Sequence, residues 1–447
     1  MTTAAQTFAA FGAGLSQRPL PSEAVHHAKR ALIDWYAAAL VGSVIAPTTL
    51  LENAYAEEIG RGGAHLVSGA KATTRAAALI NGTAAHAEEV DDIYREAIYH
   101  PGAPTIAAAL AVAQDTGADG ATFLRGIIAG YEISTRIGAA LGRAHYKYWH
   151  NTGTAGTFGA AAAAASVYGL DAARFAHAIG TCGTFAAGLQ QAFRADSMSK
   201  PLHAGRAAEA GLAAAQMARA GVTGALDILD GEGGVGRAMG DAPDWVKATA
   251  TLGQNWHVTQ MTIKNHACCG HTFAAIDGAL EVQRMLAAAH GDIGRVAVAT
   301  YAPALEVAGN DHPVTSAEAR FSLKYVVATA LVHGSTRLKA FTPERLACRD
   351  TRDLMQRIDL TIDPDIDARF PNRRAAQVSV ETRDGRKAAH LQPDRKGDPE
   401  LPLTDRDLEE KFAELAEPVI GEARAKVALA RLWSIDRAAS VALARPI

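Results

Sequence analysis

From the start of the chain to about residue 265 the sequence is rich in alanine, and its apolar residues recur at helical spacing. In residues 23–40, Ala28, Leu32, Tyr36 and Leu40 follow at four-residue steps, which places them on one face of a helix that begins after Ser22 as N-cap. The same pattern predicts helices over 73–89, 103–116, 121–141, 153–168, 172–191 and 200–220. This pattern of apolar residues predicts a large all-helical domain over residues 1–267.

The pattern changes after the adjacent cysteines 268 and 269. Residues 294–301 alternate between apolar and polar side chains, as in a half-buried strand. A second alternating stretch, 376–383, runs into Asp384-Gly385 and then 387–391, which is a hairpin signature. Together with a short strand at 358–362, these predict an α+β domain over residues 268–395, with helices at 271–289, 317–332 and 350–358. We expect residues 396–447 to return to the helical domain, so that the fold is mainly α with two domains.

One stretch has the length of a membrane span. Trp149–Leu170 carries no Asp, Glu, Lys or Arg, and about 20 apolar residues suffice to cross a bilayer. Its middle is alanine rather than leucine, however, and it contains His150, several threonines and several glycines. The stretch therefore predicts a buried helix of a soluble protein, and we expect no membrane partner.

Charge and cysteine content narrow the class of protein further. Among 447 residues, 44 Lys and Arg stand against 47 Asp and Glu, a formal charge of -3 that gives no general attraction to nucleic acid or to an anionic membrane. Four scattered cysteines do not form a disulfide framework. Residues 1–17 contain no basic residue, so the charged start of a signal peptide is missing and we expect a cytoplasmic protein.

Two clusters of polar residues interrupt the apolar sequence in the first half of the chain. One runs from His86 through four acids in five positions, Glu88 to Asp92, and is followed by His100 before Pro-Gly. The acids are read either as a solvated helix end or as part of a site, and His100 is expected in a loop. In the other cluster, His150 precedes Asn-Thr-Gly-Thr and a helix, which is read equally well as an anion site or as a helix cap with an incidental histidine.

The third cluster places Lys200 directly before Pro201 at the start of a helix, with His203 on the same face and Arg206 one turn later. A cation is unfavourable against the helix dipole at that end, so Lys200 calls for an explanation. A substrate carboxylate would find both N–H donors and an ammonium there.

The fourth cluster is Lys264, His266, Cys268, Cys269 and His271. Adjacent cysteines lack the C-x2-C spacing with which two thiolates share one zinc ion, so we expect no metal. The alternative reading is that Lys264 and His271 point into a cleft. The signatures of nucleotide-binding loops, zinc proteases and serine hydrolases are missing. Lysines, histidines and acids remain, which suits proton transfer on an anionic substrate without a cofactor.

Taken in order, the clusters resemble the MmgE/PrpD family, which includes 2-methylcitrate dehydratase, cis-aconitate decarboxylase and iminodisuccinate epimerase. The matching text comprises Asn81-Gly82 through His86, Asp91-Asp92, His100-Pro101, Gly130-Tyr131-Glu132, Arg136, His150, Lys200 through Gly205, Lys264, Cys269, His271 and Glu318 through Ser322. The resemblance implies a large helical domain, a smaller α+β lid domain, an active site between them and a homodimer. It also implies chemistry next to a carboxylate of a small di- or tricarboxylate, with neither metal nor organic cofactor.

The resemblance matches the family's site positions to His100, His150, Lys200, Lys264 and His271. Two hydroxyl-bearing positions of the decarboxylase pattern, a Thr and a Tyr, are Ile93 and Val307 here, which speaks against decarboxylation. We therefore expect an epimerase acting on an amino-dicarboxylate such as iminodisuccinate, with a 2-methylcitrate-type dehydratase as the alternative. A helical binding protein and a metal-dependent lyase are the other classes.

The epimerase hypothesis needs one neutral base and one protonated acid. Lys200 or His271 would be the base, and Lys264 or a histidine such as His100 would be the acid. Tyr146 or Tyr148 could replace either of them. We expect the substrate to be held by His150, Asp91, His203, Glu89 and Arg206.

Overall fold

The computed structural model describes residues 2–195 and 197–443, and the chain packs into two compact units. The first unit comprises Met1–Ile263 and Thr404–Ile447, and the second comprises Lys264–Leu403. The sequence placed the two boundaries after residues 267 and 395. Each unit is described by itself.

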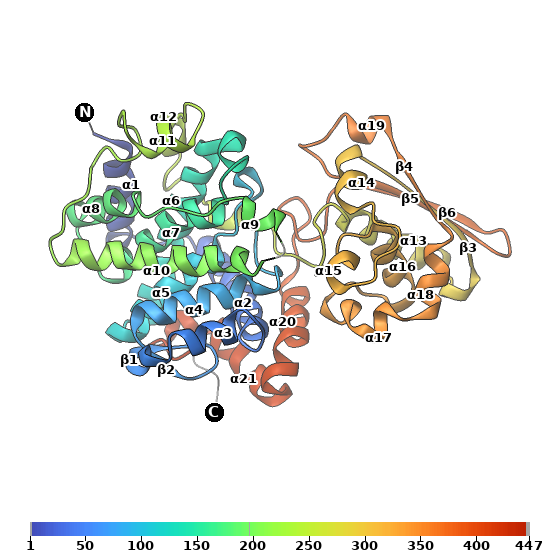
Figure 1. The fold of residues 1–447 in the computed structure, drawn as a ribbon, viewed down its shortest axis with the longest axis horizontal. Coiled ribbons are helices and arrows are strands. Elements are labelled where there is room, and N and C mark those ends of the chain that lie inside the picture. Colours follow the sequence, from blue (N-terminus) through green and yellow to red (C-terminus); the bar gives the residue numbers. More distant parts are fainter. Residues whose placement is uncertain (1, 196, 444–447) are drawn as a thin grey trace. The chain divides into compact units, whose positions relative to one another are not determined.

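The first unit consists mainly of helices (Figure 1). Their bounds are α1 Ala4–Gly14, α2 Ser22–Gly42, α3 Thr48–Ala54, α4 Thr74–Ala87, α5 Gly102–Thr116, α6 Gly120–Tyr146, α7 Asn151–Val167, α8 Ala172–Cys182, α9 Gln191–Arg194, α10 Ser199–Arg219, α11 Val235–Met239, α12 Trp245–Ala250, α20 Asp405–Ile420 and α21 Glu422–Trp433. Helix α7 packs against α5, α6 and α10, while α4 packs against α5 and α10, and α20 packs against α2.

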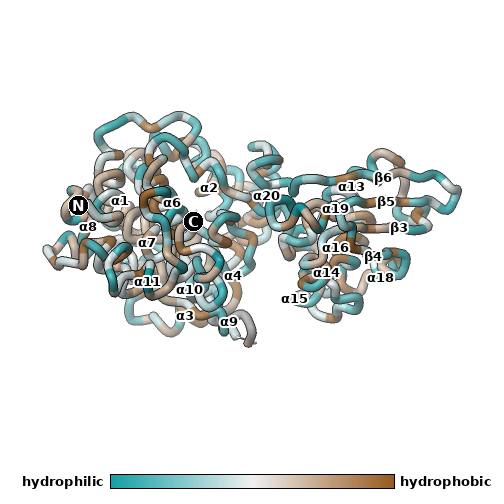
Figure 2. Tube along the Cα trace, turned by 90° about the horizontal axis from the view of Figure 1, so that it is seen from above, coloured by the Kyte–Doolittle hydropathy of each residue, from teal (hydrophilic) through white to brown (hydrophobic). Residues whose placement is uncertain are grey.

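Helix α7 is the centre of this unit. Every residue from Asn151 to Ala165 is buried, so the charge-free stretch of the sequence is an internal helix, as expected. Within the described residues, no helix combines the length and the apolar character that a bilayer crossing requires. In Figure 2 hydrophilic colours appear on loops and on α20, while the trace at α7 is drawn mainly in pale to brown colours.

The crossing of α4 and α10 is close because both helices carry glycine at the contact. A Cβ on Gly82 would lie 3.0 Å from the Cα of Gly205, and a Cβ on Gly205 would overlap the carbonyl oxygen of Leu79. These helices carry His86 and His203, so the glycine contact determines how near those two side chains come.

Three details of the first unit correct the expectations. It is not all-helical, because β1 Ile59–His65 and β2 Lys71–Ala72 form a small antiparallel sheet. Ser22 is the first residue of α2 rather than its N-cap, which is Pro21. The helix expected over 172–191 ends at Cys182, because the following segment pairs instead with the residues before α7: Gly188 accepts from the backbone N–H of His150 at 2.9 Å, and Leu189 bridges Trp149.

The second unit is an α+β structure. Its four-stranded sheet has the order β4-β3-β5-β6, with bounds β3 Ile293–Thr300, β4 Ile358–Ile362, β5 Ala376–Thr382 and β6 Lys387–Gln392. Strands β3 and β4 are parallel, and the other two pairs are antiparallel. The hairpin expected at Asp384-Gly385 is confirmed, since Gly385 has a φ of +88° and Thr382 bonds to Arg386 across the turn.

Helices cover the sheet of the second unit, and α13 packs against β5 and β6. Their bounds are α13 Phe273–Leu286, α14 Ala302–Ala308, α15 Ser316–Ala319, α16 Leu323–His333, α17 Pro343–Leu346, α18 Arg349–Met355 and α19 Pro364–Asp367. The single helix expected over 317–332 is two helices, because Ser322 leaves the helical conformation and caps α16 by accepting from the N–H of Tyr325.

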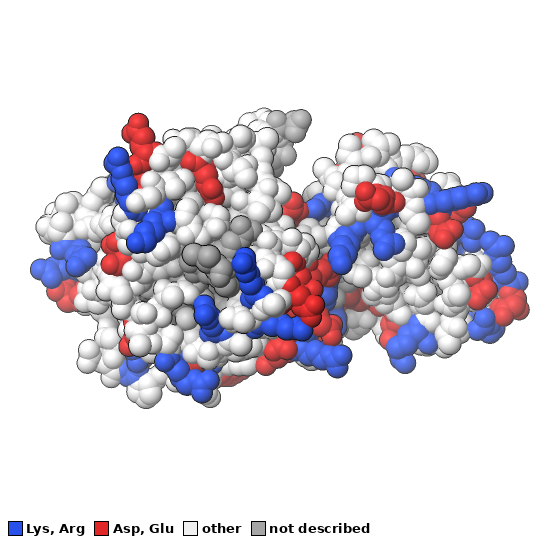
Figure 3. All heavy atoms as spheres, turned by 90° about the horizontal axis from the view of Figure 1, so that it is seen from below, with Lys and Arg blue, Asp and Glu red and all other residues white. Residues whose placement is uncertain are grey.

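Positive and negative side chains lie close together on the face drawn in Figure 3, rather than in separate fields. This mixing agrees with the near-neutral composition.

Candidate active site

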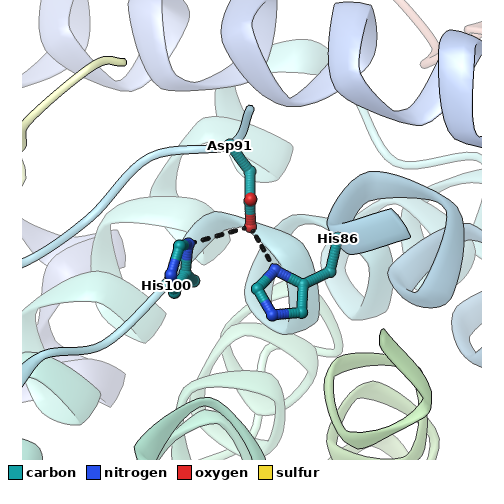
Figure 4. A group of neighbouring side chains, drawn as sticks. All are labelled: His86, Asp91 and His100. Carbon is teal, nitrogen blue, oxygen red and sulfur yellow. Dashed lines mark hydrogen bonds and ion pairs between the residues drawn. The ribbon is translucent and has the colours of Figure 1, made fainter. Parts of the chain in front are cut away.

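The centre of the candidate site is a buried carboxylate between two imidazoles (Figure 4). His86 lies in the last turn of α4, Asp91 follows in the connecting loop, and His100 precedes α5. Asp91 Oδ2 lies 2.9 Å from Nδ1 of His86 and 3.2 Å from Nδ1 of His100. The side chains of His86 and Asp91 are buried and that of His100 is 12% exposed, so of the three only His100 is partly accessible.

Asp91 is held as an anion. Burial alone would raise its pKa, but the positive charge and hydrogen bonding available from His86 and His100 hold the pKa of Asp91 well below its usual value. Because each imidazole turns Nδ1 toward the carboxylate, Nε2 is the nitrogen left for other chemistry. In the described part of the chain, His86 Nε2 and Asp91 Oδ1 are buried without a hydrogen-bond partner.

A second pair of histidines lies beside this group. The Nδ1 atoms of His150 and His203 are 3.0 Å apart, and the rings of His86 and His150 stack with centroids 5.6 Å apart. Burial, reinforced by His86 and Lys200, lowers the pKa of both His150 and His203. Both imidazoles are therefore neutral near pH 7, and one donates its Nδ1 proton to the other.

Lys200 lies in the first turn of α10, as expected. The counter-ion that the sequence left unidentified is Glu89, whose carboxylate forms a short ion pair with the Lys200 ammonium. Glu89 adopts a φ of +53°, an uncommon conformation for a residue with a Cβ, in the loop that carries Asp91. The four acids are therefore not a plain solvated helix end, since Glu89 and Asp91 belong to the histidine and lysine group.

The loop is supported by buried polar and charged groups from other elements. Asp92 accepts from the Tyr131 hydroxyl at 2.7 Å and from the Gly102 N–H at 3.0 Å. Lys411 of α20 donates to the carbonyl of Val90 at 2.7 Å and pairs with the carboxylate of Asp34 at 2.5 Å. The adjacent side chains of Asp91 and Asp92 therefore have different partners. Asp91 faces the histidines, and Asp92 holds the loop in place.

One reading of the sequence at the start of α7 was an anion site, and the structure places its two threonine hydroxyls in other bonds. Thr152 lies inside α7 and accepts from the backbone N–H of His100 at 3.3 Å, while the Thr154 hydroxyl bonds to Nε2 of His145 at 2.7 Å. The other reading was a capped helix, but the residue at the N-cap is His150, which makes no side-chain capping bond. The start of α7 instead holds the loop that ends in His100.

Two further predicted residues are placed differently from the histidine group. Arg206 has a side chain that is 65% exposed, and it forms an ion pair with Glu209 on its own helix. Tyr146 is the last residue of α6 and is half-buried, and its proton-transfer role stays a prediction.

The second unit holds the remaining predicted residues. Lys264 is its first residue and is 6% exposed. His271 lies just before α13, with Nδ1 2.9 Å from the hydroxyl of Tyr301. Burial, and secondarily Arg374 and Arg395, lowers the pKa of His271 to about 4, so this imidazole is neutral at pH 7.

Two side chains of the cysteine cluster are engaged in other bonds. His266 bonds to Asp277 and to Thr336, both at 2.8 Å, and the Cys268 thiol lies 3.2 Å from the Thr272 hydroxyl. Among the described residues, the group whose ligand atoms lie close enough to hold a metal is His86, Asp91 and His100, within 4.8 Å of one another. The Nδ1 atoms of both histidines are directed at the carboxylate of Asp91.

Sequence reasoning missed the support residues Lys411, Asp34 and Tyr301. In the first unit Lys411 contacts the loop that carries Asp91 and pairs with Asp34, and in the second unit Tyr301 contacts His271; none of the three lies in a motif. His86 belongs to the matching motif but was given no role, although it lies only five residues before Asp91 in the chain.

Comparison with known proteins places the chain in a family. Residues 6–248 match the MmgE/PrpD N-terminal domain, and residues 266–435 match the MmgE/PrpD C-terminal domain. A cis-aconitate decarboxylase-like protein of Aspergillus oryzae is 27% identical over 96% of this chain and 93% of its own length. The cis-aconitate decarboxylase of Homo sapiens is 29% identical over 75% of this chain and 71% of its own length, and that of Mus musculus is 26% identical over 75% and 70%. The names of these relatives give no support to the expected epimerase. The two domain matches cover most of the sequence, and the chain belongs to the MmgE/PrpD family.

Proposed function

We propose that the protein is a lyase that transfers a proton at the carbon next to a carboxylate of a small tricarboxylate. The relatives named as cis-aconitate decarboxylases support a lyase over the epimerase that the sequence first suggested. The clustering of lysine and histidine around a buried carboxylate supports proton transfer on an anionic substrate.

The observation that carries the proposal is the contact between Asp91 Oδ2 and His100 Nδ1. A buried carboxylate at Nδ1 orients an imidazole and stabilises its protonated form, which leaves Nε2 to take or give a proton. His100 is the partly exposed member of the group, so its Nε2 is the nitrogen that a substrate would meet.

Lys200 would bind a substrate carboxylate and stabilise the negative charge that develops beside it. Its ammonium pairs with Glu89, whose side chain is 43% exposed, so an entering carboxylate would compete with a partly solvated partner. The neutral pair His150 and His203 would add donors without adding charge.

The same groups serve both lyase reactions. In dehydration, His100 takes the proton from carbon, the C–H electron pair forms the C=C bond, and hydroxide leaves with a proton from an acid. In decarboxylation, the C–C bond breaks, carbon dioxide leaves, and the electron pair left on carbon accepts a proton from protonated His100. The relatives' names favour decarboxylation, and the apolar residues Ile93 and Val307 favour dehydration.

Incubation in D2O separates these reactions. The purified protein is mixed with cis-aconitate, 2-methylcitrate, citrate or iminodisuccinate and followed by proton NMR. Decarboxylation releases carbon dioxide and puts deuterium on the product, whereas dehydration produces an alkene from a saturated acid. An epimerase instead exchanges deuterium into a substrate whose connectivity does not change.

The variant His100→Asn tests the assigned group, with the exposed His312→Asn as control. We expect the first to lose activity by about 10²–10⁴-fold and the second to keep it. Turnover of none of these acids, or full activity in His100→Asn, would contradict the proposal.

A further inference from the structure

The buried phenol of Tyr301 meets His271 at a single point. Tyr301 follows β3 and stands at the N-cap of α14, where its side chain is fully buried and its ring stacks on Phe370 with centroids 4.9 Å apart. Its hydroxyl oxygen lies 2.9 Å from Nδ1 of His271. The two rings are tilted by 53° with centroids 5.6 Å apart, so the contact is edge-on through the polar atoms rather than a stack.

The direction of this hydrogen bond follows from what else the hydroxyl can reach. In the described residues, the Tyr301 hydroxyl bonds to no group other than His271. Leaving a buried donor without an acceptor costs about 1–3 kcal/mol, so the phenol donates its proton to Nδ1 of His271. Nδ1 is then the acceptor, and a neutral His271 must carry its own proton on Nε2.

The charges around His271 keep it in this neutral form. Arg374 and Arg395 both act on the ring, and Arg395 is itself held by a bidentate ion pair with Asp398 at 2.8 Å. With burial, they lower the pKa of His271 to about 4, while burial raises the pKa of Tyr301 so that the phenol keeps its proton. The remaining titratable neighbour, Cys269, also has a pKa raised by burial.

We propose that Tyr301 locks His271 as the Nε2–H tautomer, so that His271 donates a hydrogen bond to a substrate oxygen and is not the base. The statement about the substrate rests on the proposed function, whereas the statement about the tautomer does not. Of the two bases named from the sequence, Lys200 or His271, the second is thereby reassigned. Tyr301 is a positioning residue in this scheme, because it acts on substrate only through His271.

The tautomer is measured without substrate, by long-range proton–nitrogen NMR on the full chain labelled with ¹⁵N-histidine. The signal of His271 is assigned by its loss in His271→Gln. We expect the wild type to show the Nε2–H pattern at pH 7, and Tyr301→Phe to shift the ring toward a mixture of both tautomers. Tyr325→Phe is the matched control, because Tyr325 is equally buried in the same unit and donates its hydroxyl proton to the carbonyl of Ala340 at 2.6 Å.

An Nδ1–H pattern in the wild type would overturn the proposal, whether or not the variants fold. An unchanged His271 spectrum in folded Tyr301→Phe would also overturn it, as would an equal shift in Tyr325→Phe.

Kinetics with a turned-over acid test the role in catalysis. A glutamine amide N–H can replace an imidazole Nε2–H as a donor, so His271→Gln should keep about tenfold more kcat than His271→Ala, which should lose about 10²–10³-fold. Equal losses in both variants would show that His271 is not a donor. A correct tautomer with no activity on any tested acid would leave the tautomer standing and count against the proposed function.

Discussion

Each unit contains a histidine whose Nδ1 lies close to an oxygen atom, and the group that carries this oxygen differs. In the first unit His100 faces the anionic carboxylate of Asp91, and in the second His271 faces the neutral phenol of Tyr301. A carboxylate stabilises the protonated imidazole, whereas a phenol flanked by Arg374 and Arg395 favours the neutral one. In the proposed scheme, histidine therefore transfers a proton in the first unit and donates a hydrogen bond in the second.

Removing the carboxylate from the first histidine is the strongest test of this contrast. In Asp91→Asn the amide no longer stabilises the imidazolium, so kcat should fall by about 10³–10⁴-fold. The matched control is Asp92→Asn, because burial and the charge of Asp34 raise the pKa of Asp92 to about 8 and an amide resembles its neutral form. Steady-state kinetics at pH 7 check this, and equal losses in the two variants would remove the distinction between the acids.

A smaller effect is expected from the cations of α10. Lys200→Met should lower kcat/KM by about 10²-fold, because the substrate carboxylate loses its ion pair in a partly buried site. Arg206→Met should remain within about twofold of the wild type, since Arg206 is exposed and pairs with Glu209. A large loss in Arg206→Met would restore the substrate-binding role that the sequence suggested.

The packing that brings the histidines of the first unit together is testable by stability. Gly205→Ala should lower the free energy of unfolding by about 1–3 kcal/mol, because the new methyl group overlaps the backbone of α4. Gly14→Ala is the control, since a Cβ there meets nothing within 4 Å. Urea denaturation measures both, and an unaltered midpoint in Gly205→Ala would show that the two helices can separate at little cost.

The raised pKa of Asp92 also predicts a pH dependence of stability. Between about pH 4 and pH 8 the native state keeps a proton on Asp92 that the unfolded chain has lost, so this group lowers the free energy of unfolding as pH rises through that window. Asp92→Asn removes the contribution. The wild type should therefore lose urea stability relative to the variant between pH 5 and pH 8, and a constant difference between them would argue against the raised pKa.

Much of the architecture was predictable from local pattern. The seven expected helices of the first unit all exist, because an apolar stripe at helical spacing has few other ways to be buried. The hairpin at Asp384-Gly385 was predictable because its turn needs the positive φ that glycine allows. The break after Cys182 was missed although Gly183 and Gly188 are poor helix formers, and this segment pairs with the residues before α7.

The candidate site was predictable as a set of residues and not as an arrangement. Motif positions marked Asp91, His100, His150, Lys200 and His203, which the first unit brings together. Arg206 lies on the same helix as Lys200 but pairs with Glu209, since the helix turns it onto an exposed face. Lys411 supports the loop from the far end of the chain, and no local pattern indicated it.

By itself, the sequence determined the helical character of the first unit, the mixed character of the second and the family to which both belong. These properties depend on periodicity and on residues close together in the chain. Only the tertiary structure decided which of two adjacent aspartates is ionised, which carboxylate neutralises Lys200, and which ring nitrogen of His271 is bonded. Protonation and hydrogen-bond direction depend on burial and on neighbouring residues from elements that are distant in the chain. The spacing of residues along the sequence does not indicate either property.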